Sequence, residues 1–148
     1  MKKHEINNED AGAHIINFDK FNQPVLFDKL GIGQMRMTDF DGVMEVDNKF
    51  LILSEVKQAG KEMPYGQSLS YERVCKAWVQ SGKKGVVILA YHNELDPTKP
   101  IFLKDCIVTK IYTNGKWKSI KPIKYRDLYL RILKHWKVQK FYSLWKDI

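Results

Sequence analysis

Two apolar runs separated by one helical pattern constrain the fold of this chain more than any other feature. Residues 50–57 and 85–91 are runs of mostly apolar residues, which are typical of strands covered on both faces in a sheet with packed helices. Between them, residues 65–81 carry apolar positions at helical spacing and end at a Ser-Gly stop. The order strand, helix, strand predicts a crossover helix and an α/β fold.

Turn signals add further strands on either side. Residues 47–49, Asp-Asn-Lys, are a turn signal that joins the segment 43–46 to the first apolar run as a β-hairpin. Asn114-Gly115, the strongest short hairpin signal, joins residues 106–113 to residues 116–120. The sequence therefore predicts a central mixed sheet flanked by helices, with an added C-terminal hairpin.

Both ends of the chain have helical patterns. The opening stretch to about Leu30, with apolar Ile15, Ile16 and Phe18, predicts a helix, and residues 125–136 predict a basic amphipathic C-terminal helix. No repeat, low-complexity tract or linker interrupts the chain, and 44% apolar residues suffice for one buried core. We therefore expect residues 1–148 to form a single domain.

Charge is segregated along the chain. The formal net charge is +8, but residues 1–56 hold 6 Lys and Arg against 10 Asp and Glu, while residues 57–148 hold 19 against 7. An acidic half that can hold metal cations, joined to a basic half that can hold a polyanion, suits a protein that handles phosphodiesters. A basic protein with merely solvated lysines fits the same charges.

The sequence lacks the usual signals for membranes and secretion. The longest purely apolar stretch, residues 85–91, is far shorter than the roughly 20 residues needed to span a bilayer. The N-terminus has no apolar stretch after its lysines, as a secretory signal would. Cys75 and Cys106 are expected to be small buried residues. These features predict an intracellular, cytoplasmic protein without a membrane partner.

One group of residues suggests chemistry. Glu55 and Lys57 are two apart on a predicted strand, so both side chains project from one face, and the hairpin brings Asp39 and Asp41 back beside them. A two-residue turn places Asp41 opposite Ser54, whereas a three-residue loop places it opposite Glu55. Two carboxylates without a nearby thiolate or paired histidine favour Mg²⁺ or Mn²⁺ over zinc. A solvated strand face is the alternative, because Glu-x-Lys alone is common.

The order Asp41, hairpin, Glu55-Val56-Lys57, crossover helix and buried strand resembles the core of the PD-(D/E)XK nuclease superfamily over residues 35–91. The resemblance implies a restriction-endonuclease-like core in which Asp41 and Glu55 bind the divalent ion and Lys57 helps to activate water. The proline that names the motif is absent, and Thr38-Asp39-Phe40-Asp41 stands in its place. Asp39 therefore remains an alternative metal ligand.

A second match lies on the predicted crossover helix. Gln67-Ser68-Leu69-Ser70-Tyr71 looks like the Gln-x-x-x-Tyr signature of the RecB-like branch, whose Gln and Tyr support the site and contact nucleic acid. The spacing places Gln67 and Tyr71 on one helical face. The resemblance also implies a metal-binding Glu on the first helix, for which Glu9 is the candidate, with Glu5 or Asp10 as substitutes. No iron–sulfur cluster is expected, because the branch uses four cysteines and this chain has two.

Basic residues that can neutralise backbone phosphates are concentrated toward the C-terminus, whereas the aromatic residues among them are expected to cover the sheet. The cations predicted to bind nucleic acid are Lys61, Lys124, Arg126, Arg131, Lys134 and Lys137.

Taken together, these features predict a Mg²⁺- or Mn²⁺-dependent deoxyribonuclease of DNA repair, recombination, restriction or a mobile element. Exonuclease and endonuclease action stay open, and a homodimer is one assembly that the sequence allows. The alternatives are a non-enzymatic nucleic-acid-binding module on the same fold and a nuclease for RNA or branched DNA.

Overall fold

The computed structural model describes residues 6–7, 14–15 and 38–138 of the chain, which divides into two compact units, Met1–Met37 and Thr38–Ile148. In the first unit β1 (Ile6–Asn7) pairs antiparallel with β2 (His14–Ile15). The prediction of helix at Ile15 is therefore wrong: this residue lies in a strand and pairs with Ile6, and β-branched residues favour strands. The rest of that predicted helix lies outside the described residues, and the single domain over residues 1–148 stays a prediction.

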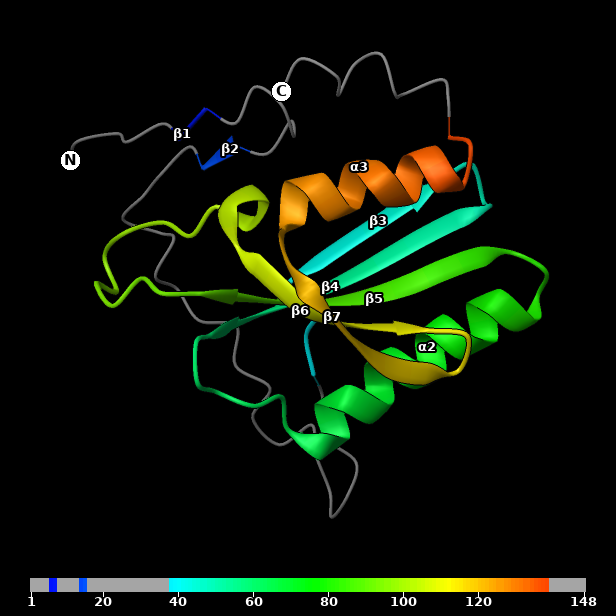
Figure 1. Ribbon diagram of the computed structural model, residues 1–148, viewed down its shortest axis with the longest axis horizontal. Coiled ribbons are helices and arrows are strands. Elements are labelled where there is room, and N and C mark those ends of the chain that lie inside the picture. Colours follow the sequence, from blue (N-terminus) through cyan, green and yellow to red (C-terminus); the bar gives the residue numbers. More distant parts are fainter. Residues whose placement is uncertain (1–5, 8–13, 16–37, 139–148) are drawn as a thin grey trace. The chain divides into compact units, whose positions relative to one another are not determined.

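A five-stranded mixed sheet forms the second unit (Figure 1). Its spatial order is β3-β4-β5-β6-β7, with β4 and β5 parallel and every other neighbouring pair antiparallel. The strands are β3 (Gly42–Val46), β4 (Phe50–Gln58), β5 (Lys84–His92), β6 (Ile107–Thr113) and β7 (Lys116–Lys124). The predicted mixed sheet is confirmed, and so is the hairpin at Asn114-Gly115.

Two helices cover opposite faces of this sheet, as Figure 1 shows. The crossover helix α2 (Tyr65–Gln80) joins the parallel strands, and α3 (Tyr125–His135) follows β7. Side chains of β4 alternate between the faces, because strand side chains have period two. Leu53 packs in the cluster that contains Tyr71 of α2, whereas Ile52 packs in the cluster that contains Leu133 of α3. The predicted α/β class with flanking helices is therefore confirmed.

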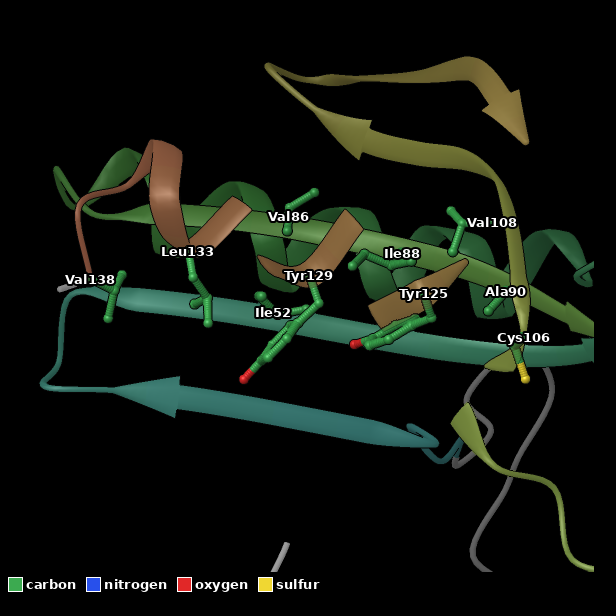
Figure 2. Close-up of a cluster of buried hydrophobic side chains, with 10 residues drawn as sticks. All are labelled: Ile52, Val86, Ile88, Ala90, Cys106, Val108, Tyr125, Tyr129, Leu133 and Val138. Carbon is green, nitrogen blue, oxygen red and sulfur yellow. The ribbon is translucent and has the colours of Figure 1, made fainter. Parts of the chain in front are cut away.

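The α3 side of the sheet holds the larger buried cluster (Figure 2). Its aromatic residues are stacked: Tyr125 and Tyr129 have ring centroids 6.1 Å apart, and Trp136 lies 5.7 Å from Phe50. The aromatic residues of this segment thus cover the sheet, as expected from helical periodicity. The buried members of the cluster are Ile52, Val86, Ile88, Ala90, Cys106, Val108, Tyr125, Tyr129, Leu133 and Val138.

The turn between β3 and β4 settles which residues face each other. Val46 pairs with Phe50, so residues 47–49 form a three-residue loop, in which Asp47 and Asn48 have φ of 54° and 56°. Asp and Asn tolerate this left-handed conformation better than other non-glycine residues. The same register pairs Gly42 with Ser54, and its extension by one residue places Asp41 opposite Glu55.

The remaining structural expectations concern single features. Cys75 and Cys106 are free and buried, in the clusters on the α2 side and the α3 side respectively. Within residues 38–138, neither helix is long and apolar enough to cross a membrane.

Candidate functional site

Glu55 is the buried centre of the site. It alternates on β4 with Leu51 and Leu53, so its side chain lies on the α2 face, and the residue is only 2% exposed. Its Oε1 lies 2.6 Å from Lys57 Nζ, and its Oε2 accepts a 2.5 Å hydrogen bond from the Tyr71 hydroxyl. An ionised carboxylate is costly to bury unless it is paired and hydrogen-bonded. Both oxygens meet this condition, so the carboxylate is held in one position.

Lys57 forms an ion pair with this buried carboxylate and is itself partly exposed to solvent. It lies two residues further along β4 on the same face, and 22% of its side chain is exposed, against 3% for the Glu55 side chain. A lysine can bury its apolar stem while its ammonium reaches the surface. The ion pair therefore spans the boundary between core and solvent at the carboxyl end of β4.

Tyr71 holds Glu55 from the helix. The residue is fully buried, and its hydroxyl is within 2.9 Å of the Ser54 carbonyl oxygen as well as of the Glu55 carboxylate. Burial raises the pKa of Tyr71 far above its ordinary value of 10.0, and the hydrogen bond with Glu55 and the charge of Glu55 add to this rise. The hydroxyl accordingly stays protonated and acts as a donor.

Asp41 reaches the same site from the edge strand. β3 begins at Gly42, opposite Ser54, so the Val56 amide extends beyond its partner strand; Asp41 Oδ2 accepts a 2.8 Å hydrogen bond from this amide. A side chain thus replaces a missing strand partner. The charge of Asp41 also raises the pKa of Tyr71, while a hydrogen bond with the Asp41 backbone lowers it. The structure therefore brings Asp41, Glu55, Lys57 and Tyr71 together.

Two predicted site residues are less closely tied to this group. Asp39 is exposed, and its side chain forms no hydrogen bond or ion pair with Glu55 or Lys57. Gln67 lies one helical turn before Tyr71 and is half-buried, but its side chain forms no hydrogen bond with any described residue. The geometry favours Asp41 over Asp39 as the first acidic residue, and the role of Gln67 stays a prediction.

The donors at this site fit a small divalent cation. Asp41 Oδ1 has no partner among residues 38–138, and each Glu55 oxygen keeps a lone pair beyond its one hydrogen bond. Mg²⁺ is often held by one or two carboxylates, with water and substrate phosphate completing its shell. No group of three or more His, Cys, Asp or Glu side chains arranged for a metal occurs in the described part of the chain. Asp41 and Glu55 are the two carboxylates here that would hold such an ion; Glu5, Glu9 and Asp10 lie outside the described residues.

The basic residues of α3 lie on the other face of the sheet. The start of α3 lies behind Glu55, because Tyr125 hydrogen-bonds to Ser54 at 2.7 Å, and Arg126 follows it. The end of α3 lies at the opposite end of β4, because Trp136 stacks on Phe50, about 17 Å along the strand from Glu55 at ~3.4 Å per residue.

The predicted nucleic-acid-binding cations are thus divided between the two ends of the sheet. Lys61, Lys124 and Arg126 lie toward the end that carries Glu55, whereas Arg131, Lys134 and Lys137 lie toward the far end. Their binding of nucleic acid stays a prediction.

A groove next to Lys57 was not foreseen from the sequence. It measures about 470 Å³, and its wall includes Gly60, Lys61, Tyr91 and Ile107. Tyr91 pairs with Lys57 in the parallel register and with Ile107 across the antiparallel one, so the groove lies at the carboxyl end of β4. Of the lining residues the sequence marked only Lys61, because strand order alone brings Tyr91 and Ile107 to it.

The site is thus built from three parts of the chain: the residue before β3, the end of β4 and the middle of α2. The predicted residues Asp41, Glu55, Lys57 and Tyr71 meet there, and the adjoining groove offers space for a larger molecule. Comparison of the chain with protein-family models, curated proteins and solved structures finds no match.

Proposed function

We propose that this protein is a metal-dependent nuclease that hydrolyses DNA, with a restriction-endonuclease-like core and a catalytic centre of Asp41, Glu55 and Lys57. The observation that carries the proposal is the buried Glu55 carboxylate, clamped between Lys57 and Tyr71 beside an anchored Asp41. A buried ion pair is weak evidence for stability, since apolar residues of similar volume often serve as well. Such an arrangement at an accessible strand end is better explained by chemistry.

Each side chain has a distinct task in the proposed reaction. Asp41 and Glu55 would hold Mg²⁺ or Mn²⁺, which when bound polarises the phosphate and makes its water more acidic. Lys57, at the solvent boundary, orients the attacking water or offsets negative charge that develops on the phosphate. Tyr71 and the Val56 amide position the two carboxylates, so that little reorganisation is needed during the reaction.

The positive charge of the protein supports a nucleic acid as the substrate. A net charge of +8 favours a polyanion, and Lys57 itself lies at the solvent boundary beside the groove, whose wall carries one cation, Lys61, and one carboxylate, Glu62. We propose an intracellular role on DNA, in repair, recombination, restriction or a mobile element. RNA and branched DNA are the other phosphodiester substrates that the same chemistry accepts.

A non-enzymatic nucleic-acid-binding module is the second candidate. It is favoured by the position of Arg131 and Lys134, which lie on the face opposite Glu55 and at the far end of the sheet. A binding surface there would need no carboxylate. In that case Glu55 and Lys57 serve structure alone.

Matched acidic variants test the nuclease. The full chain is incubated with labelled single-stranded, duplex and branched DNA and with RNA, in Mg²⁺, Mn²⁺ or EDTA. We expect cleavage of DNA that EDTA stops, and a loss of at least about a hundredfold in Asp41→Asn, since a metal ligand is removed. Asp39→Asn, two residues away with the same chemical change, should keep the parental rate. Full activity in EDTA, or equal losses in both variants, would contradict the two-carboxylate site.

Glu55→Gln separates cleavage from binding. Its cleavage should be abolished, whereas its DNA affinity in EDTA should persist or increase, because a negative charge that faces phosphate has gone. DNA binding by the parental protein with no cleavage of any substrate in either metal would favour the binding module instead.

A further inference from the structure

A second cavity, of about 500 Å³, lies at the opposite end of the sheet from Glu55. Lys84 at the start of β5 lines it and pairs with Phe50 in the parallel register, about 17 Å along β4 from Glu55 at ~3.4 Å per residue. Lys84 alternates with Val86, which packs in the α3-side cluster, so this part of the wall belongs to the α3 face. The cavity is therefore separate from the Glu55 site in position, at the other end of the sheet, and Val79 of α2 also contributes to its wall.

The lining of this cavity is cationic. Its wall includes three cations, Lys83, Lys84 and Arg131, together with His135, and among the described residues it includes no Asp or Glu. The side chains of Lys84 and Arg131 have no ion-pair or hydrogen-bond partner among residues 38–138. Like charges gathered close together repel one another and create a positive potential that attracts an anion.

Two of the lining side chains are held in place. Lys83 Nζ donates a 2.6 Å hydrogen bond to Asn48 Oδ1 and lies 4.2 Å from the centre of the Trp78 ring. Trp136 is stacked on Phe50 with an angle of 19° between the rings, and its residue remains partly exposed. The cavity thus combines a fixed cation with a fixed aromatic surface.

These features select a class of ligand. Lysine and arginine bind phosphate oxygens, and an exposed indole surface stacks on planar bases. A volume of about 500 Å³ lies within the range of small-molecule pockets, roughly 300–1,000 Å³. We infer that this cavity binds the phosphate of a nucleotide whose base lies against Trp136. The nucleotide is either a free mononucleotide or one unit of a nucleic-acid strand, and it is not the unit that reacts at Glu55.

Binding measurements on the full chain in EDTA test this inference. The ligands are inorganic phosphate, AMP, adenosine and a single-stranded oligonucleotide of adenosine nucleotides. In the paired variant Lys84→Gln with Arg131→Gln we expect affinity for the bound phosphate ligand to fall at least about tenfold, and the slope of log affinity against log salt for the oligonucleotide to drop by about 0.7 for each lost contact. The control pair Lys104→Gln with Lys121→Gln removes the same charge from exposed residues outside the cavity and should change affinity less than about twofold.

The pattern of ligands identifies the source of the phosphate. Binding of AMP that the cavity pair weakens indicates a free nucleotide, and binding of the oligonucleotide alone indicates a strand. Trp136→Leu should weaken binding of AMP or the oligonucleotide but leave phosphate unchanged. No binding of any ligand, stronger binding of adenosine than AMP, or equal losses in the cavity and control pairs would overturn the inference. Since cleavage is not measured, these outcomes are independent of the Asp41 and Glu55 assays.

Discussion

At the scale of single residues, Lys57 distinguishes the two proposed functions, because it acts in the reaction of a nuclease but only supports structure in a binding module. Lys57→Ala removes a cation that acts mainly as charge develops on phosphate, so kcat should fall by on the order of a hundredfold while DNA affinity changes little. Lys99→Ala, an exposed loop lysine, is the matched control and should keep the parental kcat. Urea unfolding must accompany the assay, because Glu55 loses its counter-charge. A variant that folds normally and cleaves at the parental rate would place the site elsewhere.

The raised pKa of Tyr71 makes the free energy of unfolding depend on pH in the alkaline range. The pKa values of Tyr71, Tyr125 and Tyr129 are all raised, chiefly by burial. Above about pH 10 an unfolded tyrosine loses its proton while the folded one keeps it. The unfolded state then binds fewer protons, so the free energy of unfolding falls as pH rises, by up to ~1.4 kcal/mol per pH unit for each tyrosine. Cys75, whose pKa is raised to about 11 from 9.0, adds a similar loss from about pH 9.

Tyr71→Phe should therefore have two effects. At pH 8 it removes the donor from two buried oxygens and lowers the free energy of unfolding by about 1–3 kcal/mol. Between pH 10 and 11 its free energy of unfolding should fall less steeply with pH than that of the parental protein, because one titrating tyrosine has been removed. Urea midpoints measured from pH 8 to 11 check both effects, and parallel pH profiles would show that Tyr71 titrates as in the unfolded chain.

At the scale of elements, α2 packs tightly against β5 at Gly85. A Cβ added there would lie 3.1 Å from Trp78 Cδ1 and 3.3 Å from Cys75 Sγ, both on α2. Gly85→Val should therefore lower the free energy of unfolding by about 1–3 kcal/mol, because the helix must move from the sheet. Gly66→Ala is the control within the same helix, since nothing lies within 4 Å of its Cβ, and it should be neutral or slightly stabilising. Urea unfolding of both variants is the measurement; equal stabilities would show that this approach is not tight.

The elements themselves were largely predictable from the sequence. Apolar runs predicted β4 and β5, helical spacing predicted α2 and α3, and Asn114-Gly115 predicted the last hairpin. The register of the first hairpin was not predictable, because the left-handed conformations of Asp47 and Asn48 decide between a two-residue and a three-residue turn. The pairing of Ile6 with Ile15 was missed, since strands of two residues leave no periodicity to detect.

The candidate site shows the same limit. Period two placed Glu55 and Lys57 on one face, and helical spacing placed Tyr71 toward it. The Tyr71 hydrogen bond to Glu55 and the Val56 amide that anchors Asp41 depend on where β3 ends and on how α2 packs. These are tertiary properties, and a linear pattern does not contain them.

At the scale of the molecule, the five-stranded sheet separates the Asp41 and Glu55 carboxylates from the basic residues at the end of α3. Lys134 and Lys137 are exposed at the far end of the sheet from Glu55. Reversal of both to Glu should weaken DNA binding and flatten its salt dependence by about one unit of slope for each lost phosphate contact. Turnover at saturating DNA should stay unchanged, because neither residue is near Lys57. An unchanged salt slope would remove this end of α3 from the interface.

The strand topology also predicts the order in which the strands pair during folding. The parallel pair β4–β5 lies between two antiparallel hairpins, β3–β4 and β6–β7. Each hairpin closes through a short turn, whereas the parallel pair must bring together segments separated by all of α2. Longer closures cost more entropy, and non-local pairings form more slowly. We expect pulsed hydrogen exchange during refolding to protect the amides of β6 and β7 before those that join β4 to β5; simultaneous protection would contradict this order. Tyr71 lies on α2, within the segment that this closure orders, so we expect its hydrogen bond to Glu55, and with it the proposed catalytic centre, to form late in folding.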